Sequence, residues 1–502
     1  MQAQQRMQDI EHEVAVIGAG ISGLASAHAL HRAGRDVVVL ERSGSAGGRI
    51  HSERRDGFLV EHGPNSMVAP APAAEQLIGS LGLGAQRIER GEQVRNRYLV
   101  RDGRARALPI HPLRFFASSF FSLPGRLRLL AEPFIAALPG DEAVAGFVRR
   151  RFGDELARYV FDPLVGGLYA GDPENLSIEA LFPHLKRLER EHGSVMRGAW
   201  AARRAGKRGF DPRARALFSF QGGMATLPQA IVAALPQRVF CGCAVEYIEP
   251  LAAGFRLTVR RHEPAGPPPG RTPECAASRG PDQQTSTLRA RAVVIATPAY
   301  AAARLLEPLD ATVAVALGSI AHPPLAVVAL AYPRDAIAHP LDGLGLLAPK
   351  VEQRGVLGLI FSSTLFAGRA PEGHVLLTAY VGGARQPALA QLARDDLVAL
   401  VHDEVRELLG AKAGARPVFT SVRYWRRSLP QPDLGHGQRM AGLDAFQQRW
   451  PGLVLTGNYT GGVSTAACIA SGEAAARRVV EHLGAEVPEA RRAAGVPRRI
   501  SA

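Results

Sequence analysis

The feature that most constrains this chain is a glycine-rich turn between a short apolar run and an alanine-rich segment. A short strand pattern at 13–17 is apolar after Glu13, a helical pattern covers 21–31, and a second strand pattern at 36–40 is β-branched after Asp36. This order predicts a βαβ unit with buried parallel strands. Its turn consists of Gly18, Ala19, Gly20, Ile21, Ser22 and Gly23. Glycines at this spacing allow a tight turn, a close approach of pyrophosphate and helix–strand packing, so the sequence predicts an α/β fold that binds a dinucleotide.

An acidic residue and a second glycine pair extend this pattern. Glu41 ends the second strand, where a carboxylate can accept hydrogen bonds from ribose hydroxyls. Arg42, Gly48 and Arg49 complete the spacing E-R-x-x-x-x-G-G-R. A guanidinium group binds phosphate oxygens in a bidentate manner, so we expect Arg49 to contact a pyrophosphate. The alternative is a surface arginine that follows a glycine loop.

Composition excludes several other classes of function. The 502 residues carry a formal charge of +14, but only four of the 60 basic residues are lysines, and no RNA-binding or zinc-finger motif accompanies them. Arginine bias from genomic base composition explains the charge, so no nucleic-acid partner is expected. Four cysteines at these spacings predict neither a disulfide framework nor a metal site. With no secretory signal and no apolar run long enough to span a bilayer, we expect a cytoplasmic protein.

Three segments differ from the rest of the chain. Residues 262–287 are rich in Pro, Gly, Ser and Gln and predict a flexible loop, and 485–502 lack an apolar face and predict a flexible tail. Residues 108–139 mix Phe and Leu with Arg. This mixture is typical of helices that dip into a membrane surface, but an ordinary helical subdomain with a buried aromatic face is equally compatible with it.

The E-R-x-x-x-x-G-G-R spacing resembles the extended fingerprint of the amine-oxidase-like flavoprotein superfamily. Further blocks resemble one branch of it, the oxygen-dependent, FAD-containing protoporphyrinogen oxidase family, and run in family order over nearly the whole chain. These blocks are residues 61–66, 161–173, 218–228, 361–363 with 369–371, 429–431 with 435–436, and 457–459 with 462–463.

The resemblance implies an FAD-dependent oxidase of haem biosynthesis. Protoporphyrinogen IX would lose six electrons to become protoporphyrin IX, while three molecules of dioxygen are reduced to hydrogen peroxide. Three partner hypotheses accompany it: peripheral contact with the inner face of the cell membrane, hand-off of the porphyrin to ferrochelatase, and a homodimer. The chain offers no zinc-protease, nucleophile-elbow or P-loop motif as another catalytic engine, and no catalytic residue is nominated.

The resemblance also implies which residues bind the cofactor. Besides the glycine turn, Glu41, Arg42, Gly48 and Arg49, the family pattern assigns this role to Gly63, Pro64, Asn65, Ser66, Val245, Asn458, Val463, Ser464 and Thr465. The last three begin a helix, whose N-terminal N–H groups would stabilise negative charge on a reduced flavin. Trp425 is a further candidate, for which simple core packing is the alternative.

Five residues match family positions that bind the substrate. Arg97 would pair with a propionate, although a surface arginine is the alternative for this residue type. Gly167 would let a macrocycle approach the backbone closely. Leu347, Ile360 and Tyr380 would sandwich the rings, and the hydroxyl of Tyr380 is not essential to that role.

The expected architecture is a discontinuous Rossmann-like FAD-binding domain with a mixed-sheet substrate domain and an inserted helical, membrane-associating domain. The FAD-binding domain would comprise 10–90, 215–300 and 416–484. The substrate domain would comprise 91–107 and 301–415, and the helical domain 108–214. The active site would lie between them.

Three other functions compete with this interpretation. The first is a coproporphyrinogen III oxidase, whose substrate carries four propionates. A more basic pocket would favour this function. The second is another oxidase of the superfamily, acting on amines or carotenoids. The third is a non-catalytic flavin-binding protein that carries a tetrapyrrole to a partner.

Overall fold

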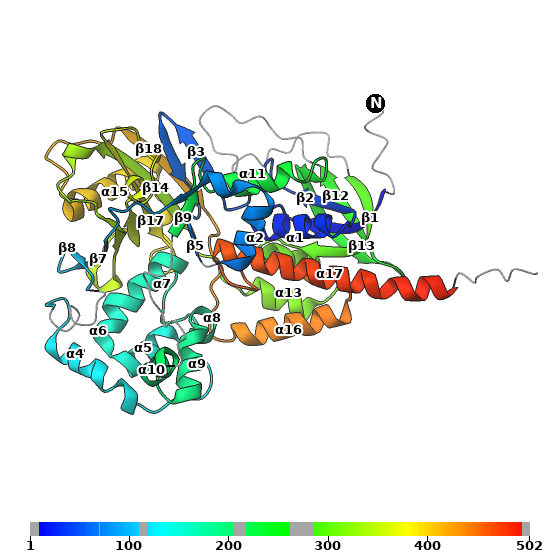
Figure 1. Cartoon of the computed structure of the whole chain (residues 1–502), viewed down its shortest axis with the longest axis horizontal. Helices are drawn as coiled ribbons and strands as arrows, with labels where there is room; N and C mark the ends of the chain where they lie inside the picture. The colour runs from blue at the N-terminus through cyan, green and yellow to red at the C-terminus, as the bar shows by residue number, and fades with distance from the viewer. Residues whose placement is uncertain (1–9, 70, 110–117, 205–216, 262–284, 494–502) are drawn as a thin grey trace, which may run out of the picture.

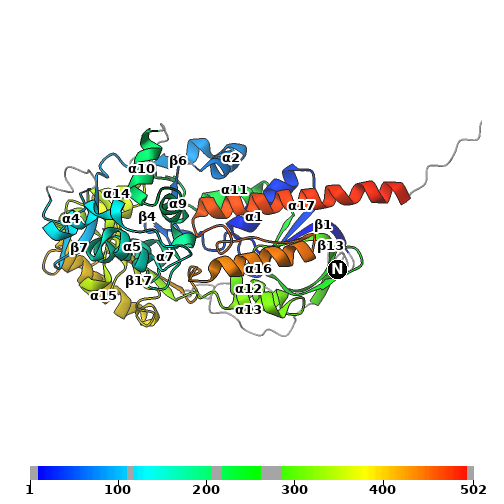
Figure 2. The same ribbon diagram turned by 90° about the horizontal axis from the view of Figure 1, so that it is seen from below.

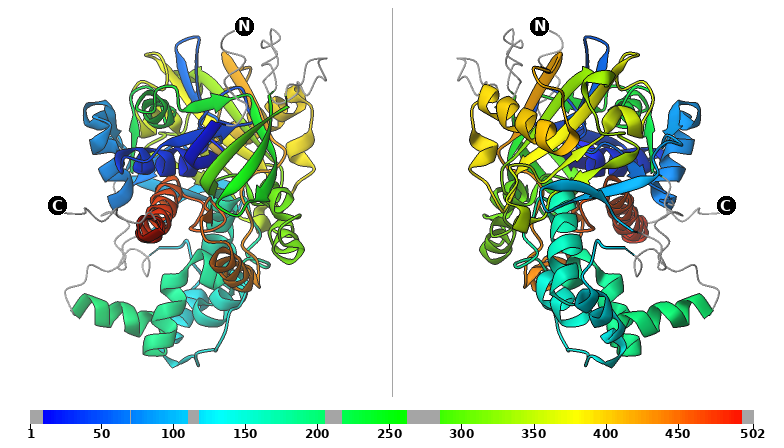
Figure 3. Two further views of the ribbon diagram at one scale, coloured as in Figure 1. Left: turned by 90° about the vertical axis from the view of Figure 1, so that its right-hand side faces the viewer. Right: turned by 90° about the vertical axis from the view of Figure 1, so that its left-hand side faces the viewer.

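The computed structural model describes residues 10–69, 71–109, 118–204, 217–261 and 285–493. Two mixed sheets lie side by side, and a layer of helices lies below the second of them, at the lower left of Figure 1 and at the bottom of both views in Figure 3. Each of the two sheets takes its strands from distant parts of the chain and is therefore discontinuous in sequence.

The first sheet carries the predicted βαβ unit. Its strands run in the order β10-β2-β1-β13-β12-β11, and β19 also pairs with β13. The neighbours β2, β1, β13 and β19 are parallel. The seven strands are β1 (Ile10–Ile17), β2 (Val37–Glu41), β10 (Val239–Cys241), β11 (Cys243–Pro250), β12 (Phe255–Arg261), β13 (Thr285–Ile295) and β19 (Leu453–Leu455).

Helices cover both faces of this sheet, which explains why its central strands are apolar on both sides (Figure 2). One face packs against α1 (Ile21–Arg32), α2 (Pro72–Ser80), α11 (Thr226–Ala233) and α17 (Thr465–Ala493). The other face packs against α12 (Ala299–Leu306), α13 (Ala311–Gly318) and α16 (His436–Arg449).

The second sheet has the order β18-β14-β17-β16-β15-β7-β8. Its strands are β7 (Asn96–Arg101), β8 (Arg104–Ala107), β14 (Leu325–Pro333), β15 (Gly343–Leu347), β16 (Gly358–Ile360), β17 (His374–Gly382) and β18 (Phe419–Trp425). One face buries its apolar residues against α15 (Arg394–Leu409). The hairpin of β3 (Ser52–Arg55) and β4 (Phe58–Glu61) packs on part of the opposite face.

The helical layer is formed by one continuous part of the chain. It contains α4 (Leu123–Leu130), α5 (Val144–Phe152), α6 (Asp154–Leu156), a π-helical turn (Ala157–Phe161), α7 (Asp162–Tyr169), α8 (Ile178–Leu181), α9 (Pro183–His192) and α10 (Val195–Arg204). A small sheet of β5 (Met67–Val68), β9 (Leu217–Phe220) and β6 (Arg87–Glu89) lies where the chain re-enters the first domain.

The structure corrects two of the predicted domain boundaries. Strand β18 pairs with β14, so residues 419–425 belong to the second sheet and not to the nucleotide-binding domain. Helices α12 and α13 pack on the first sheet, so residues 301–318 belong to the nucleotide-binding domain and not to the second sheet. Both errors arose because tertiary pairing, which sequence patterns do not encode locally, assigns these elements.

Parts of the two segments predicted as flexible belong to regular elements. Residues 285–287 pair with β12 as part of β13, whereas 262–284 lie outside the described residues. Helix α17 continues to Ala493, through Gly484 and Pro488, although local helix propensity is low at both residues. Only 494–502 of the predicted tail lie outside the described residues.

Candidate functional site

The glycine turn is tight at its first and third glycines and open at its second. Gly18 has a φ of +103°, and a Cβ there would lie 2.9 Å from Ala296 O. A Cβ on Gly23 would lie 2.0 Å from Gly18 O. A Cβ on Gly20 would meet nothing within 4 Å. The turn therefore has the closed ends and the open middle that a bound pyrophosphate requires.

Glu41 lies beside this turn. Its Oε2 accepts a hydrogen bond from Ala19 N at 2.7 Å, and its Oε1 accepts one from Ser43 N at 2.8 Å. The carboxylate thus lies at the end of β2, next to the turn, where the sequence placed it. Val245 lies in β11, which follows β10, the strand paired with β2, after the single residue Gly242. Arg42 is exposed beside Glu41.

The second glycine pair packs directly against the turn. Gly47 N donates to Ala19 O at 2.8 Å, and a Cβ on Gly48 would lie 3.1 Å from Gly20 Cα. On the other side, a Cβ on Gly63 would lie 1.9 Å from Arg49 O. The backbone of residues 47–49 is therefore held between the glycine turn and the segment 63–66.

Trp425 joins this region to the second sheet. Its indole Nε1 donates to His62 O at 2.7 Å. The guanidinium groups of Arg49 and Arg423 lie 4.5 Å and 4.8 Å from the indole ring centroid. Arg49 also donates to Arg427 O. Trp425 is buried, so it packs in the core as well as contacting the candidate phosphate-binding arginine.

Helix α17 brings its N-terminus to the same region. Ser464 Oγ caps the helix by accepting from Ala467 N at 3.1 Å. A Cβ on Gly472 would lie 2.2 Å from Ser22 O, so α17 packs closely against the first turn of α1. Val463 and Thr465 flank the cap, and Asn458 is half-buried in the preceding loop. The free N–H groups of two helices therefore converge here, which favours a bound anion.

Two polar groups that the sequence analysis missed adjoin this region. Thr297 Oγ1 and Tyr459 Oη are buried without a hydrogen-bond partner among the described residues. A Cβ on Gly457 would lie 3.0 Å from the Tyr459 ring and 3.7 Å from Thr297 O, so both residues adjoin Gly457. Burial raises the pKa of the Tyr459 hydroxyl. Buried polar groups normally have hydrogen-bond partners. A polar cofactor bound beside Gly457 would supply partners for these two hydroxyls. Thr297 follows a central parallel strand, a position from which it could have been found.

Four of the five predicted substrate residues lie on one face of the second sheet, and the fifth, Gly167, lies on α7 against that face. Leu347 pairs with Gly358 and Gly358 with Tyr380, so these residues share one face. Ile360 lies two residues after Gly358 in β16 and has the same orientation.

Arg97 and Gly167 reach the same face from other elements. Leu99 pairs with Leu347, and Arg97 lies two residues before Leu99 in β7. A Cβ on Gly167 would lie 2.4 Å from Leu347 Cδ2, so α7 lies against this face. We call these five residues the substrate face.

The side chain of Arg97 is half-buried at one end of the substrate face. Burial lowers the pKa of its guanidinium group, and the charge of Arg90 lowers it further. A guanidinium group remains protonated at neutral pH after such a shift. The residue therefore provides a positive charge beside an otherwise apolar surface.

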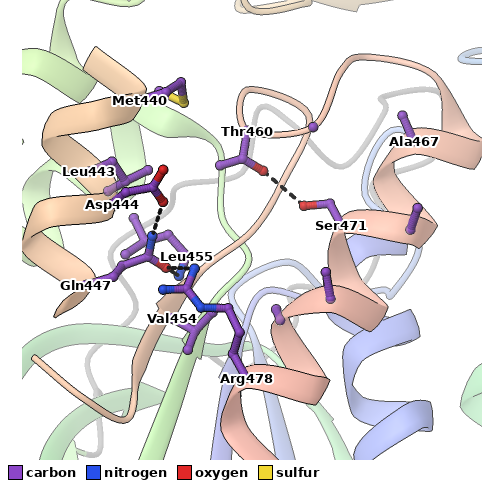
Figure 4. Close-up of a pocket in the computed structure, with 14 residues that line it drawn as sticks. Met440, Leu443, Asp444, Gln447, Val454, Leu455, Thr460, Ala467, Ser471 and Arg478 are labelled. Carbon is purple, nitrogen blue, oxygen red and sulfur yellow. Dashed lines mark hydrogen bonds between the residues drawn. The ribbon is translucent and has the colours of Figure 1, made fainter. Parts of the chain in front are cut away.

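A separate cavity of about 350 Å³ lies between α16 and α17 (Figure 4). Thr460 and Ser471 share a hydrogen bond at one side, and Arg478 donates to Gln447 at the other. None of the predicted site residues lines this cavity. Convergence of the glycine turn, α17 and the substrate face, and not this cavity, defines the candidate site.

Comparison with known proteins agrees with this geometry. The glycine turn with Glu41 and the helix termini are features typical of a dinucleotide-binding protein. Residues 21–480 match the family described as flavin containing amine oxidoreductase. The chain belongs to this family, whose members use a flavin cofactor.

Full-length relatives fall into two groups of named enzymes. The chain is 30% identical to the mitochondrial protoporphyrinogen oxidase of Nicotiana tabacum, over 94% of this chain and 95% of that protein. It is 34% identical to the coproporphyrinogen III oxidase of Propionibacterium freudenreichii, over 96% of this chain and 93% of that protein. A crystal structure assigned as a protoporphyrinogen oxidase from Exiguobacterium has the same fold, with a TM-score of 0.75 at 20% identity, over 95% of this chain and all of that one.

Proposed function

We propose that this protein is an FAD-dependent oxidase that converts protoporphyrinogen IX into protoporphyrin IX with dioxygen as acceptor. The substrate would lose six electrons and six protons, which three dioxygen molecules take up as three molecules of hydrogen peroxide. The observation that carries this proposal is the substrate face itself. Apolar side chains, a helix that presents a glycine, and one arginine form a surface that suits an apolar tetrapyrrole macrocycle with carboxylate substituents.

The residues that hold FAD in this proposal are those of the glycine turn, Glu41, the segment 47–49 and the N-terminus of α17. Bound FAD would supply the two-electron redox chemistry. The turn and helix N–H groups would bind the pyrophosphate, and Glu41 would accept hydrogen bonds from the ribose. Thr297 Oγ1 and Tyr459 Oη, which have no partner among the described residues, are available to the polar edge of the flavin ring.

The protein's contribution to the reaction is to orient the substrate. Leu347, Ile360 and Tyr380 would contact one face of the macrocycle, and Gly167 would leave room for it beside α7. Arg97 would fix the rotation of the ring by pairing with a propionate. Orientation of this kind places the reacting carbon beside the flavin for each successive two-electron step.

A coproporphyrinogen III oxidase is the second candidate function. It is favoured by the 34% identity to a relative of that name and by Arg90, whose positive charge acts on Arg97. A second cation near Arg97 suits a substrate with more carboxylates. The two candidates share one site and differ only in the substituents that the site accepts.

One assay separates these functions. The purified holoenzyme is supplied aerobically with protoporphyrinogen IX and coproporphyrinogen III in parallel, and porphyrin fluorescence and peroxide are followed. We expect faster oxidation of protoporphyrinogen IX, with FAD released on denaturation. Preference for coproporphyrinogen III would establish the second candidate. Oxidation of neither would overturn both and leave the amine, carotenoid or carrier functions.

We further propose that α4 contacts a membrane surface. Leu123, Leu127 and Leu130 recur at helical spacing along α4, and Phe134 lies in the 3-10 turn that follows it (Glu132–Phe134). All four are more than half exposed, with Phe134 at 82%. Phe120 and Phe121, by contrast, are buried between the second sheet and the helical layer, where they pack with Leu99. No helix among the described residues is both long and apolar enough to cross a bilayer. A peripheral contact through the exposed stripe is the arrangement that these observations support.

Vesicle sedimentation tests this contact. We expect the protein to sediment with vesicles that contain phosphatidylglycerol, and the triple variant Leu123→Ser, Leu127→Ser, Phe134→Ser to remain in the supernatant. Val315→Ser is the control, because Val315 is 72% exposed on α13 in the other domain. Equal sedimentation of the triple variant and the wild type would contradict the proposal.

A further inference from the structure

Helix α7 lies unusually close to its neighbours at two adjacent glycines. A Cβ on Gly167 would lie 2.4 Å from Leu347 Cδ2 on the substrate face. A Cβ on Gly166 would lie 2.6 Å from Arg385 Nη2. The helix is therefore fixed between the sheet and a buried guanidinium group, and any movement of that group changes the room beside Leu347.

Arg385 forms a buried ion pair with the first residue of α7. Its Nη2 lies 2.8 Å from Asp162 Oδ1, and the side chains are only 4% and 11% exposed. The guanidinium group also donates to Asp162 O. The second carboxylate oxygen of Asp162 accepts from Lys350 N at 2.7 Å. Asp162 thus ties the start of α7 to the segments that follow β17 and β15.

The turn that carries Arg385 also holds the other end of α7. Ala384 N donates to Ala170 O, the C-cap residue of the helix, at 2.7 Å. A Cβ on Gly383, whose φ is +69°, would lie 2.5 Å from the same oxygen. This turn directly follows β17, the strand of Tyr380. One short segment therefore fixes both ends of α7 relative to the substrate face.

We propose that Asp162 and Arg385 are positioning residues that set the spacing between α7 and the substrate face, and thereby the fit of the tetrapyrrole macrocycle. Neither residue lies in the row of side chains that would contact the substrate. A buried ion pair contributes little net stability compared with apolar residues, but it fixes orientation because each partner leaves an uncompensated charge if it moves. This inference rests on the proposed function.

The test compares the flavin-loaded Arg385→Met and Arg385→Lys variants with the wild type. We expect Arg385→Met to raise KM for the preferred porphyrinogen about tenfold or more with a smaller change in kcat, because binding geometry and not the redox step is affected. Arg385→Lys should recover part of the loss, since it keeps the charge. Flavin content and the flavin absorption spectrum should be unchanged.

Arg354→Met is the matched control. Arg354 forms ion pairs with Glu404 and Glu407 of α15, on the other face of the same sheet. The Arg354→Met variant should have a lower melting temperature and an unchanged KM. An unchanged KM in Arg385→Met, or an equal increase in Arg354→Met, would overturn the positioning role. If Arg385→Met does not fold, an unchanged KM in Arg385→Lys would overturn the positioning role. If the wild type oxidises neither porphyrinogen, the proposed function fails, and this inference fails with it.

Discussion

Asn65 Nδ2 donates a hydrogen bond to Tyr380 Oη at 2.5 Å, across the boundary between the two sheets. Asn65 belongs to the segment expected to contact the flavin, and Tyr380 belongs to the substrate face. The two residues are 315 positions apart in sequence. This contact places the candidate cofactor site and the candidate substrate site against each other.

Removal of the Tyr380 hydroxyl should affect stability more than activity. Tyr380→Phe would leave the buried amide of Asn65 without its partner, which costs about 1–3 kcal/mol. The ring that would contact the macrocycle remains, so kcat/KM should change less than about fivefold. Thermal unfolding and steady-state kinetics provide the measurements. A large loss of kcat at unchanged stability would instead assign the hydroxyl a catalytic role.

Two alanine substitutions in the glycine turn should have different effects. Gly20→Ala introduces a Cβ with nothing within 4 Å, and the extended backbone of Gly20 accepts alanine. This variant should fold with a loss of at most about 1 kcal/mol, yet retain little FAD, because the methyl group occupies the space for pyrophosphate.

Gly23→Ala is the comparison, because its Cβ would lie 2.0 Å from Gly18 O. It should destabilise the fold itself by about 1–3 kcal/mol or more. Flavin content and unfolding of the flavin-free proteins distinguish the two effects. Normal flavin content in Gly20→Ala would place the pyrophosphate elsewhere.

Arg97→Ala should impair substrate binding. A charge-assisted pair with a carboxylate contributes about 1.5–3 kcal/mol, so kcat/KM should fall roughly 10- to 200-fold. Arg97→Lys should restore only part, because an ammonium group lacks the planar fork. Arg104→Ala is the control, because Arg104 is an exposed arginine of the adjacent β8. It should leave kcat/KM unchanged. Normal kinetics in Arg97→Ala on both porphyrinogens would show that the residue is a surface arginine.

The helical layer should be sensitive to acid through Glu189. This carboxyl is 1% exposed and pairs with Arg150, Arg151 and Lys186. Burial opposes its ionisation, but hydrogen bonds from these three cations outweigh burial and lower its pKa to about 2. A lowered carboxyl pKa stabilises the fold above about pH 4.5, and this contribution is lost as the pH falls towards 2.

Glu189→Gln should therefore reduce the free energy of unfolding by about 3–5 kcal/mol at pH 7, because it leaves buried cations uncompensated. The difference from the wild type should shrink below pH 4.5. Urea unfolding at several pH values measures it. A difference that is constant from pH 7 to pH 3 would contradict the predicted linkage.

Residues 262–284 should be dispensable. They connect β12 to β13, which are antiparallel neighbours, and Arg260 pairs with Thr285 at the open end of the hairpin. A short Gly-Ser linker can therefore join the two strands. Flavin content and turnover should stay within twofold of the wild type. Failure of this variant to fold would show that the segment belongs to the core.

The first domain was largely predictable because its signals are local. The turn between β1 and α1 needs glycine at particular positions, and the apolar runs of β1, β2 and β13 identify buried strands. The second sheet was less predictable from the sequence. Its strands β7, β14 and β18 come from distant parts of the chain, and no local pattern indicates that they pair.

The sequence by itself determined the βαβ unit, the glycine turn and the acidic residue at the end of β2, because backbone conformation and strand burial restrict which residues can occupy them. Only the tertiary structure decided that Tyr380 meets Asn65, that Trp425 packs beneath Arg49 and that Arg385 holds α7 against Leu347. These contacts join residues far apart in the chain. Their geometry depends on how both sheets and the helical layer pack together, which a single sequence does not specify position by position.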